Sequence, residues 1–317
     1  MPTPGYSEIC LLNNKKFSIM KRRNFILQAT LSTLAFTGLP FAGFTGPGKS
    51  KMNRIGLTTV VFRNRFASTK PKNVVLENEL TLLSAPEYFV DRFNVHNVEM
   101  WTNHFESTSK NYLKEIKKSL HKHHCSLINL QSEGKFDPSD PLEENRLQAV
   151  IEVKNWVDIA QVLGCESLRV RSMKKSYPQA VLSLKEITKY AKSKGVRILI
   201  ENHNDMFSHY QTHISTIKDI SMDNIGLLAD FGNYSSNMVR FDSLRHIAPF
   251  TMLVSAKAKD FSDQMDHNGY DFQKCIRIFE DQGFKGIYSC EQWGKANPSY
   301  DYEKITDWMI EHIKESI

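Results

Sequence analysis

The chain reads Gly-Val-Arg-Ile-Leu-Ile-Glu-Asn-His-Asn at residues 195–204 and, one helix length later, Asn-Ile-Gly-Leu-Leu-Ala-Asp-Phe-Gly-Asn at residues 224–233. Each stretch is a short apolar run that ends in a carboxylate, Glu201 in the first and Asp230 in the second. Runs of this length between turn residues are typical of strands buried on both faces of a parallel sheet. Such strands are open to a ligand only at their C-terminal ends, so the two carboxylates predict a site there.

The same alternation of strand and helix extends over residues 53–317. Strands are predicted at 54–62, 95–101, 126–131, 167–171, 196–200, 225–229, 252–257 and 286–291. Helices are predicted at 74–83, 86–93, 109–124, 143–163, 178–194, 241–247, 272–282 and 303–314, with a further helix between the fifth and sixth strands. Gly164 and Gly195 follow two of them as C-caps. Eight strand–helix pairs favour a closed (β/α)8 barrel over an open doubly wound sheet. No Gly-x-Gly-x-x-Gly motif follows a strand, which disfavours dinucleotide binding.

The N-terminal segment has the pattern of an export signal. From Met20 a basic Lys21-Arg22-Arg23 group precedes an apolar stretch and a small-residue zone near residue 42. The arginine pair suggests the twin-arginine route, and the apolar run is too short and broken for a membrane anchor. We therefore expect residues 1–44 to be an upstream extension plus signal peptide with the start at Met20, 45–52 a linker, and 53–317 the barrel of an exported, periplasmic protein without a stable membrane span.

The basic charge of the whole chain belongs mostly to this leader. The formal net charge is +6, but residues 1–44 hold five Lys or Arg and one acidic residue, so the remainder carries +2. A nucleic-acid partner is therefore not expected. The four cysteines beyond the leader form no C-x-x-C pair, so neither a zinc knuckle nor a redox motif is indicated.

Charged and polar side chains gather at the predicted strand ends. The set is Glu201, Asp230, Lys257 and Glu291, with His203, Asn233 and Trp293 directly beyond strands, Arg169 inside the fourth strand, and Glu133 in the loop after the third. Carboxylates in one pocket repel each other, so a positive charge must be present if all are ionised. A divalent metal could supply it, with Mn²⁺ or Mg²⁺ favoured by oxygen ligands and Zn²⁺ if an imidazole joins. Lys257 could supply it instead, because an ammonium is a donor and not a ligand.

Glu201 and Glu291 are candidates for an acid/base pair. Two carboxyl groups across the barrel mouth could remove a proton from one face of a sugar carbon and return one on the other. Isomerisation or epimerisation next to a carbonyl needs that pair and a cation for the enediolate oxygens. We therefore expect Glu201, Glu291 and Lys257 to be catalytic, and His203, Arg169, Asn233, Trp293 and Glu133 to contact the substrate.

Several segments together resemble the xylose isomerase-like superfamily of sugar phosphate isomerases and epimerases, and in particular a group of exported bacterial members. They are 132–134, 149–156, 163–170, Ile-Glu-Asn-His at 200–203, Asp-Phe-Gly-Asn at 230–233, Val-Ser-Ala-Lys at 254–257, and 291–294. The resemblance covers residues 53–317 and implies a single xylose isomerase-like TIM barrel.

The resemblance also implies roles for the strand-end residues. Those matching Glu201, Asp230 and Glu291 bind a divalent metal in the family, and the two glutamates are its acid/base pair. The family's fourth ligand is a histidine where this chain has Lys257, and a histidine is also common at the position of Asn233. We consider His203 as a substitute fourth ligand, and a metal-free site with Lys257 as electrophile or base as the alternative.

Three functional readings stay open. The first is a sugar isomerase or epimerase, the second a keto-sugar lyase or dehydratase of the same fold, and the third a non-catalytic sugar-binding barrel. The expected partner is a neutral sugar or keto-sugar, because no Gly-rich phosphate loop follows the last two strands. A homo-oligomer is compatible with the sequence.

Overall fold

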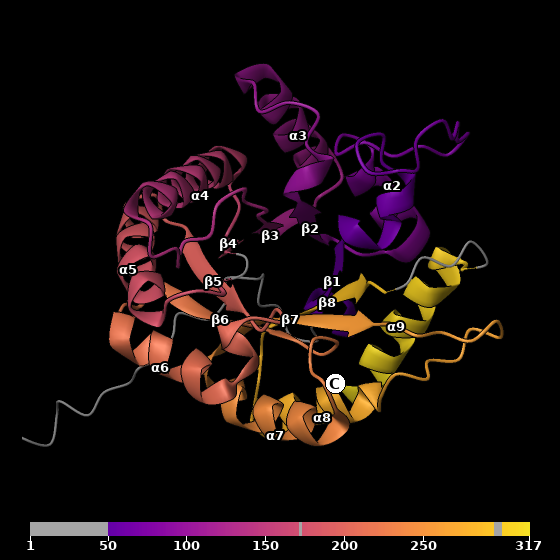
Figure 1. Cartoon of the computed structure of the whole chain (residues 1–317). Helices are drawn as coiled ribbons and strands as arrows, with labels where there is room; N and C mark the ends of the chain where they lie inside the picture. The colour runs from indigo at the N-terminus through magenta and orange to yellow at the C-terminus, as the bar shows by residue number, and fades with distance from the viewer. Residues whose placement is uncertain (1–49, 171–172, 295–299) are drawn as a thin grey trace, which may run out of the picture. The chain divides into compact units, whose positions relative to one another are not determined.

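The computed structural model describes residues 50–170, 173–294 and 300–317, and these form a barrel of parallel strands. The strands follow the sequence order around the barrel, and β1 closes it by pairing with β8 (Figure 1). The strands are β1 (Ile55–Thr58), β2 (Asn97–Trp101), β3 (Ser126–Gln131), β4 (Ser167–Val170), β5 (Arg197–Glu201), β6 (Ile225–Asp230), β7 (Thr251–Ala258) and β8 (Ile287–Gln292). The predicted closed (β/α)8 barrel is confirmed.

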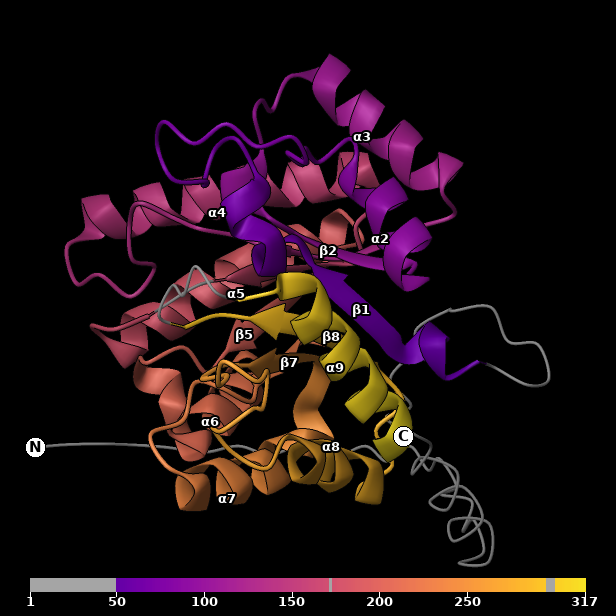
Figure 2. The same ribbon diagram turned by 90° about the vertical axis from the view of Figure 1, so that its right-hand side faces the viewer.

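Helices cover the outside of the barrel. They are α2 (Ala85–Phe93), α3 (Lys110–Lys122), α4 (Glu143–Leu163), α5 (Tyr177–Ser193), α6 (Tyr210–Ile220), α7 (Asn237–Ile247), α8 (Phe272–Asp281) and α9 (Tyr302–Ser316). Figure 2 shows α9 beside β8, on which it packs. Gly164 is the C-cap of α4 at φ 73°, as predicted. The C-cap of α5 is Lys194, and Gly195 follows it at φ 70°.

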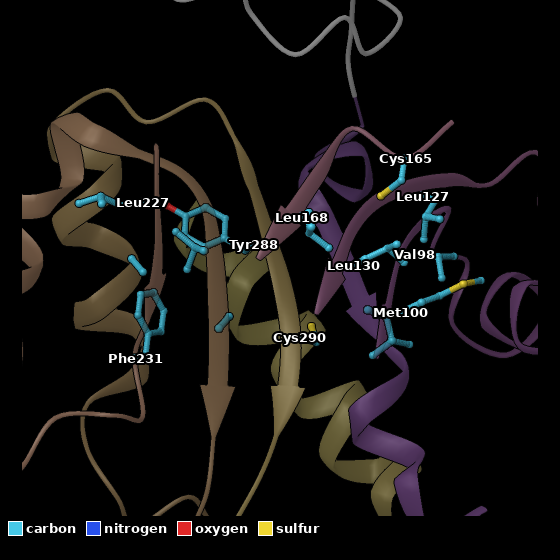
Figure 3. Packing of buried hydrophobic residues seen from close by; sticks show 14 of the residues in the cluster. Val98, Met100, Leu127, Leu130, Cys165, Leu168, Leu227, Phe231, Tyr288 and Cys290 are labelled. Atoms are coloured by element: carbon cyan, nitrogen blue, oxygen red, sulfur yellow. The ribbon is translucent and has the colours of Figure 1, made fainter. Parts of the chain in front are cut away.

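Two apolar layers hold the strands in place. One lies between strands and helices and includes Leu227, Phe231, Tyr288 and Cys290 (Figure 3). The other contains strand residues alone and fills the inside of the barrel: Ile128, Leu199, Leu228, Leu253 and Ile287. Because the interior is packed, polar groups are confined largely to the strand ends.

The N-terminal part of the barrel departs from the predicted elements. The first strand was expected at 54–62, but β1 ends at Thr58 and the chain continues as the 3-10 helix η2 (Thr59–Arg65). The hydroxyl of Thr58 caps this turn by accepting from the N–H of Val60, and η2 buries its apolar residues without extending the sheet. The helix expected at 74–83 is also wrong: this segment forms turns, Val75 is 94% exposed, and Leu80 makes a single bridge to Phe66.

None of the described helices has both the length and the apolar composition that a membrane crossing needs. Within the described part of the chain the four cysteines are free thiols, and three of them are buried. The leader predicted at residues 1–44 lies outside the described residues, as does Arg171 at the end of the fourth predicted strand.

Candidate active site at the barrel mouth

Four charged residues end consecutive strands and meet at the C-terminal mouth of the barrel. Glu201 ends β5, Asp230 ends β6, Lys257 lies near the end of β7 and Glu291 near the end of β8. Their exposed fractions are 4%, 0%, 4% and 6%. The parallel register places Lys257 directly beside Glu291. The structure therefore brings together the four residues that the sequence singled out at strand ends.

Lys257 lies at the centre of this group. Its Nζ is 2.5 Å from Asp230 Oδ2 and 3.0 Å from Glu291 Oε1, and it donates to Asn233 Oδ1 at 3.2 Å. Burial favours the neutral amine, but Asp230, Glu291 and Glu201 outweigh it and raise the pKa of Lys257 above its ordinary value. The side chain is thus an ammonium at neutral pH.

The carboxylates around this ammonium differ in their titration. Burial raises the pKa of Asp230 to about 7; Lys257 opposes that shift, while Glu291 and Glu201 add to it. Burial also disfavours ionisation of Glu291, but Lys257 and Arg169 lower the pKa of Glu291 below its ordinary value. At Asp230 burial therefore outweighs the ammonium, whereas at Glu291 the two cations outweigh burial.

Glu201 is held by an amide and a guanidinium. Asn233 Nδ2 donates to Glu201 Oε1 at 3.2 Å, and Arg169 Nε is 3.0 Å from Glu201 Oε2. Arg169 also donates to the carbonyl of Ser132 and lies 3.7 Å from Glu133 Oε1. Arg169 was predicted to contact the substrate, and in the structure it pairs with Glu201 at the mouth of the barrel.

Glu291 has two further partners that the sequence did not indicate. Its Oε2 accepts from Gln131 Nε2 at 3.1 Å and from Ser255 Oγ at 3.0 Å. Gln131 is the last residue of β3, so its strand-end position was a usable signal. Ser255 lies within β7, two residues before Lys257 on the same face of the strand, and its hydroxyl reaches Glu291 from there.

Glu99 lies deeper in the barrel, fully buried. Its carboxyl oxygens accept from Asn129 Nδ2 and Ser289 Oγ, both at 2.6 Å. Burial raises the pKa of Glu99 to about 7, against these two hydrogen bonds. No cation pairs directly with Glu99 among the ion pairs of the described residues.

Aromatic side chains line one wall of the mouth. Trp293 follows β8 and is 43% exposed, with its ring 5.8 Å from Trp101 and the Arg63 guanidinium 4.5 Å from the Trp293 ring centroid. Trp101 Nε1 donates to Glu133 Oε1 at 3.0 Å. Trp293 and Glu133, both predicted substrate contacts, thus lie on the wall formed after β2, β3 and β8.

A cavity of about 240 Å³ adjoins Glu133 on the side of α4. Its lining includes Phe136, Trp156 and Lys174. Neither Asp230 nor Lys257 is among the residues that line this cavity.

The donor set does not fit a divalent metal bound by Glu201, Asp230 and Glu291. The ammonium of Lys257 fills the position between Asp230 and Glu291, and an ammonium has no lone pair for a metal. His203, considered as a substitute fourth ligand, lies two residues beyond the end of β5 and is half-buried. No cluster of three metal-ligating side chains occurs in the ranges that the structure describes. No catalytic step through a metal is therefore derived.

The comparisons with known proteins agree with this architecture. The sequence profile of the family described as xylose isomerase-like TIM barrel matches residues 90–315, and the chain belongs to that family. No curated protein sequence matches the chain.

Solved structures of the same fold are similar at low sequence identity. One is a xylose isomerase-like TIM barrel protein from Mycobacterium smegmatis in complex with magnesium (13% identity, TM-score 0.60, 83% of this chain and 97% of the other). A second is 3-keto-D-glucoside 4-epimerase from E. coli (13%, 0.59, 81% and 98%). A third is D-psicose 3-epimerase from Clostridium cellulolyticum, solved with D-tagatose (12%, 0.61, 83% and 96%). At these identities the likeness concerns the fold.

Proposed function

We propose that the protein is a sugar epimerase or isomerase that transfers a proton at a carbon next to a carbonyl group. The observation that carries this proposal is a continuous connection between two buried glutamates. Glu201 accepts from Asn233, Asn233 accepts from Lys257, and Lys257 pairs with Glu291. Two carboxyl groups are thereby held on either side of one cation at the open end of the barrel, which suits proton removal and return on a sugar carbon.

The reaction balances with these groups alone. One glutamate, ionised, takes the proton from carbon, and the electron pair of the C–H bond moves onto the carbonyl oxygen as an enolate. Both glutamates are ion-paired in the free site, so the other glutamate has to take up a proton when the sugar binds, and it returns that proton to the opposite face of the same carbon or to the neighbouring carbon. Lys257 and Arg169, both buried, stabilise the developing oxyanion in a site of low dielectric. Lys257 acts as an electrophile in this scheme, because its raised pKa keeps it protonated.

The substrate we propose is a neutral sugar or keto-sugar. Carboxylates dominate the mouth, and they would repel a phosphate group. The exposed ring of Trp293 offers an apolar surface for a sugar face, and the cavity beside Glu133 offers room for the rest of the molecule. The similar structures include 3-keto-D-glucoside 4-epimerase and D-psicose 3-epimerase, which supports the same class of substrate.

Proton exchange from deuterated water tests the proposal. Incubation with ketohexoses and 3-keto-glucosides is expected to place deuterium on a carbon next to the carbonyl, measured by NMR and mass spectrometry. Glu201→Gln and Glu291→Gln should each lower exchange by about 100-fold or more, the range for losing a general acid or base. Glu311→Gln, an exposed carboxylate of α9, is the matched control and should exchange like the parent.

Other outcomes of this experiment identify the alternatives. Loss of water from the sugar would identify a dehydratase, in which the same enolate expels a neighbouring hydroxyl group. Sugar binding with no deuterium incorporation would contradict the proposal and indicate a binding barrel.

We propose further that the mature protein works outside the cytoplasm. The basis is the sequence pattern around Arg22 and Arg23 alone.

A further inference from the structure

We infer that the Lys257 ammonium is the resident cation of this site. It occupies the position where relatives of this fold could place a divalent metal. The site therefore neither needs nor binds such a metal. The catalytic part of this inference rests on the proposed function. The part that concerns metal binding stands on geometry alone.

Three oxygen atoms surround the ammonium. Asp230 Oδ2 lies 2.5 Å and Glu291 Oε1 lies 3.0 Å from Nζ as ion-pair partners, and Nζ donates a hydrogen bond to Asn233 Oδ1 at 3.2 Å. The amide of Asn233 is the most distant and the only uncharged one, so we expect a substrate oxygen to take its place.

Each carboxylate gives one oxygen to Lys257 and keeps the other for the protein. Asp230 Oδ1 accepts from the backbone N–H of Gly232 at 2.7 Å, and Glu291 Oε2 accepts from Gln131 and Ser255. The inward-facing oxygens therefore converge on a single point, and Nζ occupies that point. A metal ion bound there would have to displace the ammonium and then remain beside it, which like charges oppose.

Gly232 shapes the space for the lysine stem. A Cβ built at this position would come within 2.7 Å of Lys257 Cδ and 3.0 Å of Cγ. The stem therefore lies flat against the backbone of Gly232, and only glycine leaves room for it.

The backbone of Lys257 is also fixed. The hydroxyl of Tyr270 donates to the Lys257 carbonyl, and the Arg240 guanidinium covers the Tyr270 ring at 4.0 Å. Gly232, Tyr270 and Arg240 thus hold the stem and backbone of Lys257 in one place.

Metal analysis of the purified full chain decides the inference. After growth in medium with Mn²⁺, Mg²⁺ and Zn²⁺, the protein is expected to hold far less than one metal per chain by mass spectrometry. Its Tm should be the same in EDTA and in excess MnCl₂, since a ligand stabilises only a protein that binds it. Exchange of sugar protons should persist in EDTA. One bound metal per chain, a Tm that rises with Mn²⁺, or exchange that EDTA abolishes and Mn²⁺ restores would overturn the inference.

Lys257→His tests the role of the lysine itself. This change removes the ammonium and supplies an imidazole next to Asp230 and Glu291, so a folded variant is expected to show a Tm that rises with Mn²⁺ concentration. Lys285→His, at an exposed position before β8, controls for surface histidines and should show no such rise. A folded Lys257→His variant that gains no Mn²⁺ response would contradict the claim that Lys257 excludes the metal.

The two proposals fail in different ways. A metal-free protein without deuterium exchange would contradict the proposed enzyme activity and leave Lys257 as the cation of the site. Exchange that requires Mn²⁺ would support the enzyme activity and contradict the assignment of Lys257 as that cation.

Discussion

Arg169 and Glu201 form a buried ion pair, with Nε 3.0 Å from Oε2 and side-chain exposures of 6% and 4%. The pair joins the ends of β4 and β5 and orients one of the two glutamates proposed to move protons. Removing one member of a buried pair leaves the other charge uncompensated.

Arg169→Met should therefore destabilise the protein by about 3 kcal/mol, the scale for breaking a buried ion pair from one side. The free energy of unfolding in urea is the measurement. Arg169→Met combined with Glu201→Gln should recover part of the loss, because the unpaired carboxylate is gone. Equal losses in the single and double variants would show that Arg169 acts through packing and not through its charge.

Gly232→Ala should disturb Lys257 specifically. The added methyl group would meet Lys257 Cδ at 2.7 Å, and the ion pairs of the ammonium prevent the stem from moving freely. We expect a loss of about 1–3 kcal/mol in unfolding free energy, typical of overpacking, and a clear fall in deuterium exchange. Gly294→Ala is the control, since its Cβ would meet Lys259 Cβ at an ordinary 3.5 Å. Unchanged exchange in Gly232→Ala would contradict the role assigned to the lysine position.

Glu99 gives a pH dependence with a defined sign. Its pKa rises from 4.5 to about 7 on folding because the carboxyl group is buried. Between these values the folded state holds a proton that the unfolded state releases, so Glu99 costs stability as pH rises from 4.5 to 7. Glu99→Gln should remove this contribution, about 3 kcal/mol across the window. Unfolding free energies of both proteins at pH 4.5 and pH 7 give the comparison, and parallel pH curves would refute the assignment.

Trp293→Ala tests substrate contact at the exposed wall. The ring meets Trp101 edge to face and lies under the Arg63 guanidinium, and the residue is still 43% exposed. Once a substrate is found, we expect KM to rise about 10-fold, the effect of about 1.4 kcal/mol of lost contact, with kcat changed much less. A fall in kcat with an unchanged KM would place Trp293 in the chemical step.

The export signal is open to a direct test. Replacing both Arg22 and Arg23 by Lys should leave the uncleaved precursor in the cytoplasm if the twin-arginine route is used. Fractionation and immunoblotting of cells that express the full chain provide the readout. Normal export of the variant would exclude that route for this chain.

Much of the barrel could be predicted because buried parallel strands leave a strong local pattern. The ends of β3 and α4 match their predicted bounds, and the strand-end residues Glu201, Asp230 and Glu291 do meet. The strand predicted over the apolar run at 54–62 was too long, because helix η2 buries apolar residues as a strand would.

The pairing of side chains at the mouth could not be predicted. Lys257 and Arg169 were both recognised as cations of the site, but their partners depend on the register of neighbouring strands and on side-chain direction. The contact between Gly232 and the Lys257 stem is a further example, because nothing local in the Asp-Phe-Gly-Asn stretch shows which distant side chain will cross its glycine. Which side chains pair with Lys257 and Arg169 is decided only when the barrel is assembled.

The placement of Lys257 on β7, bound to Asp230 of β6 and Glu291 of β8, ties three adjacent strands together at one atom. A change from this site to a histidine-based one would remove both ion pairs in a single substitution and leave Asp230 and Glu291 without the ammonium, so we expect it to weaken the barrel. The proposed turnover and the stability of the fold thus depend on the same side chain.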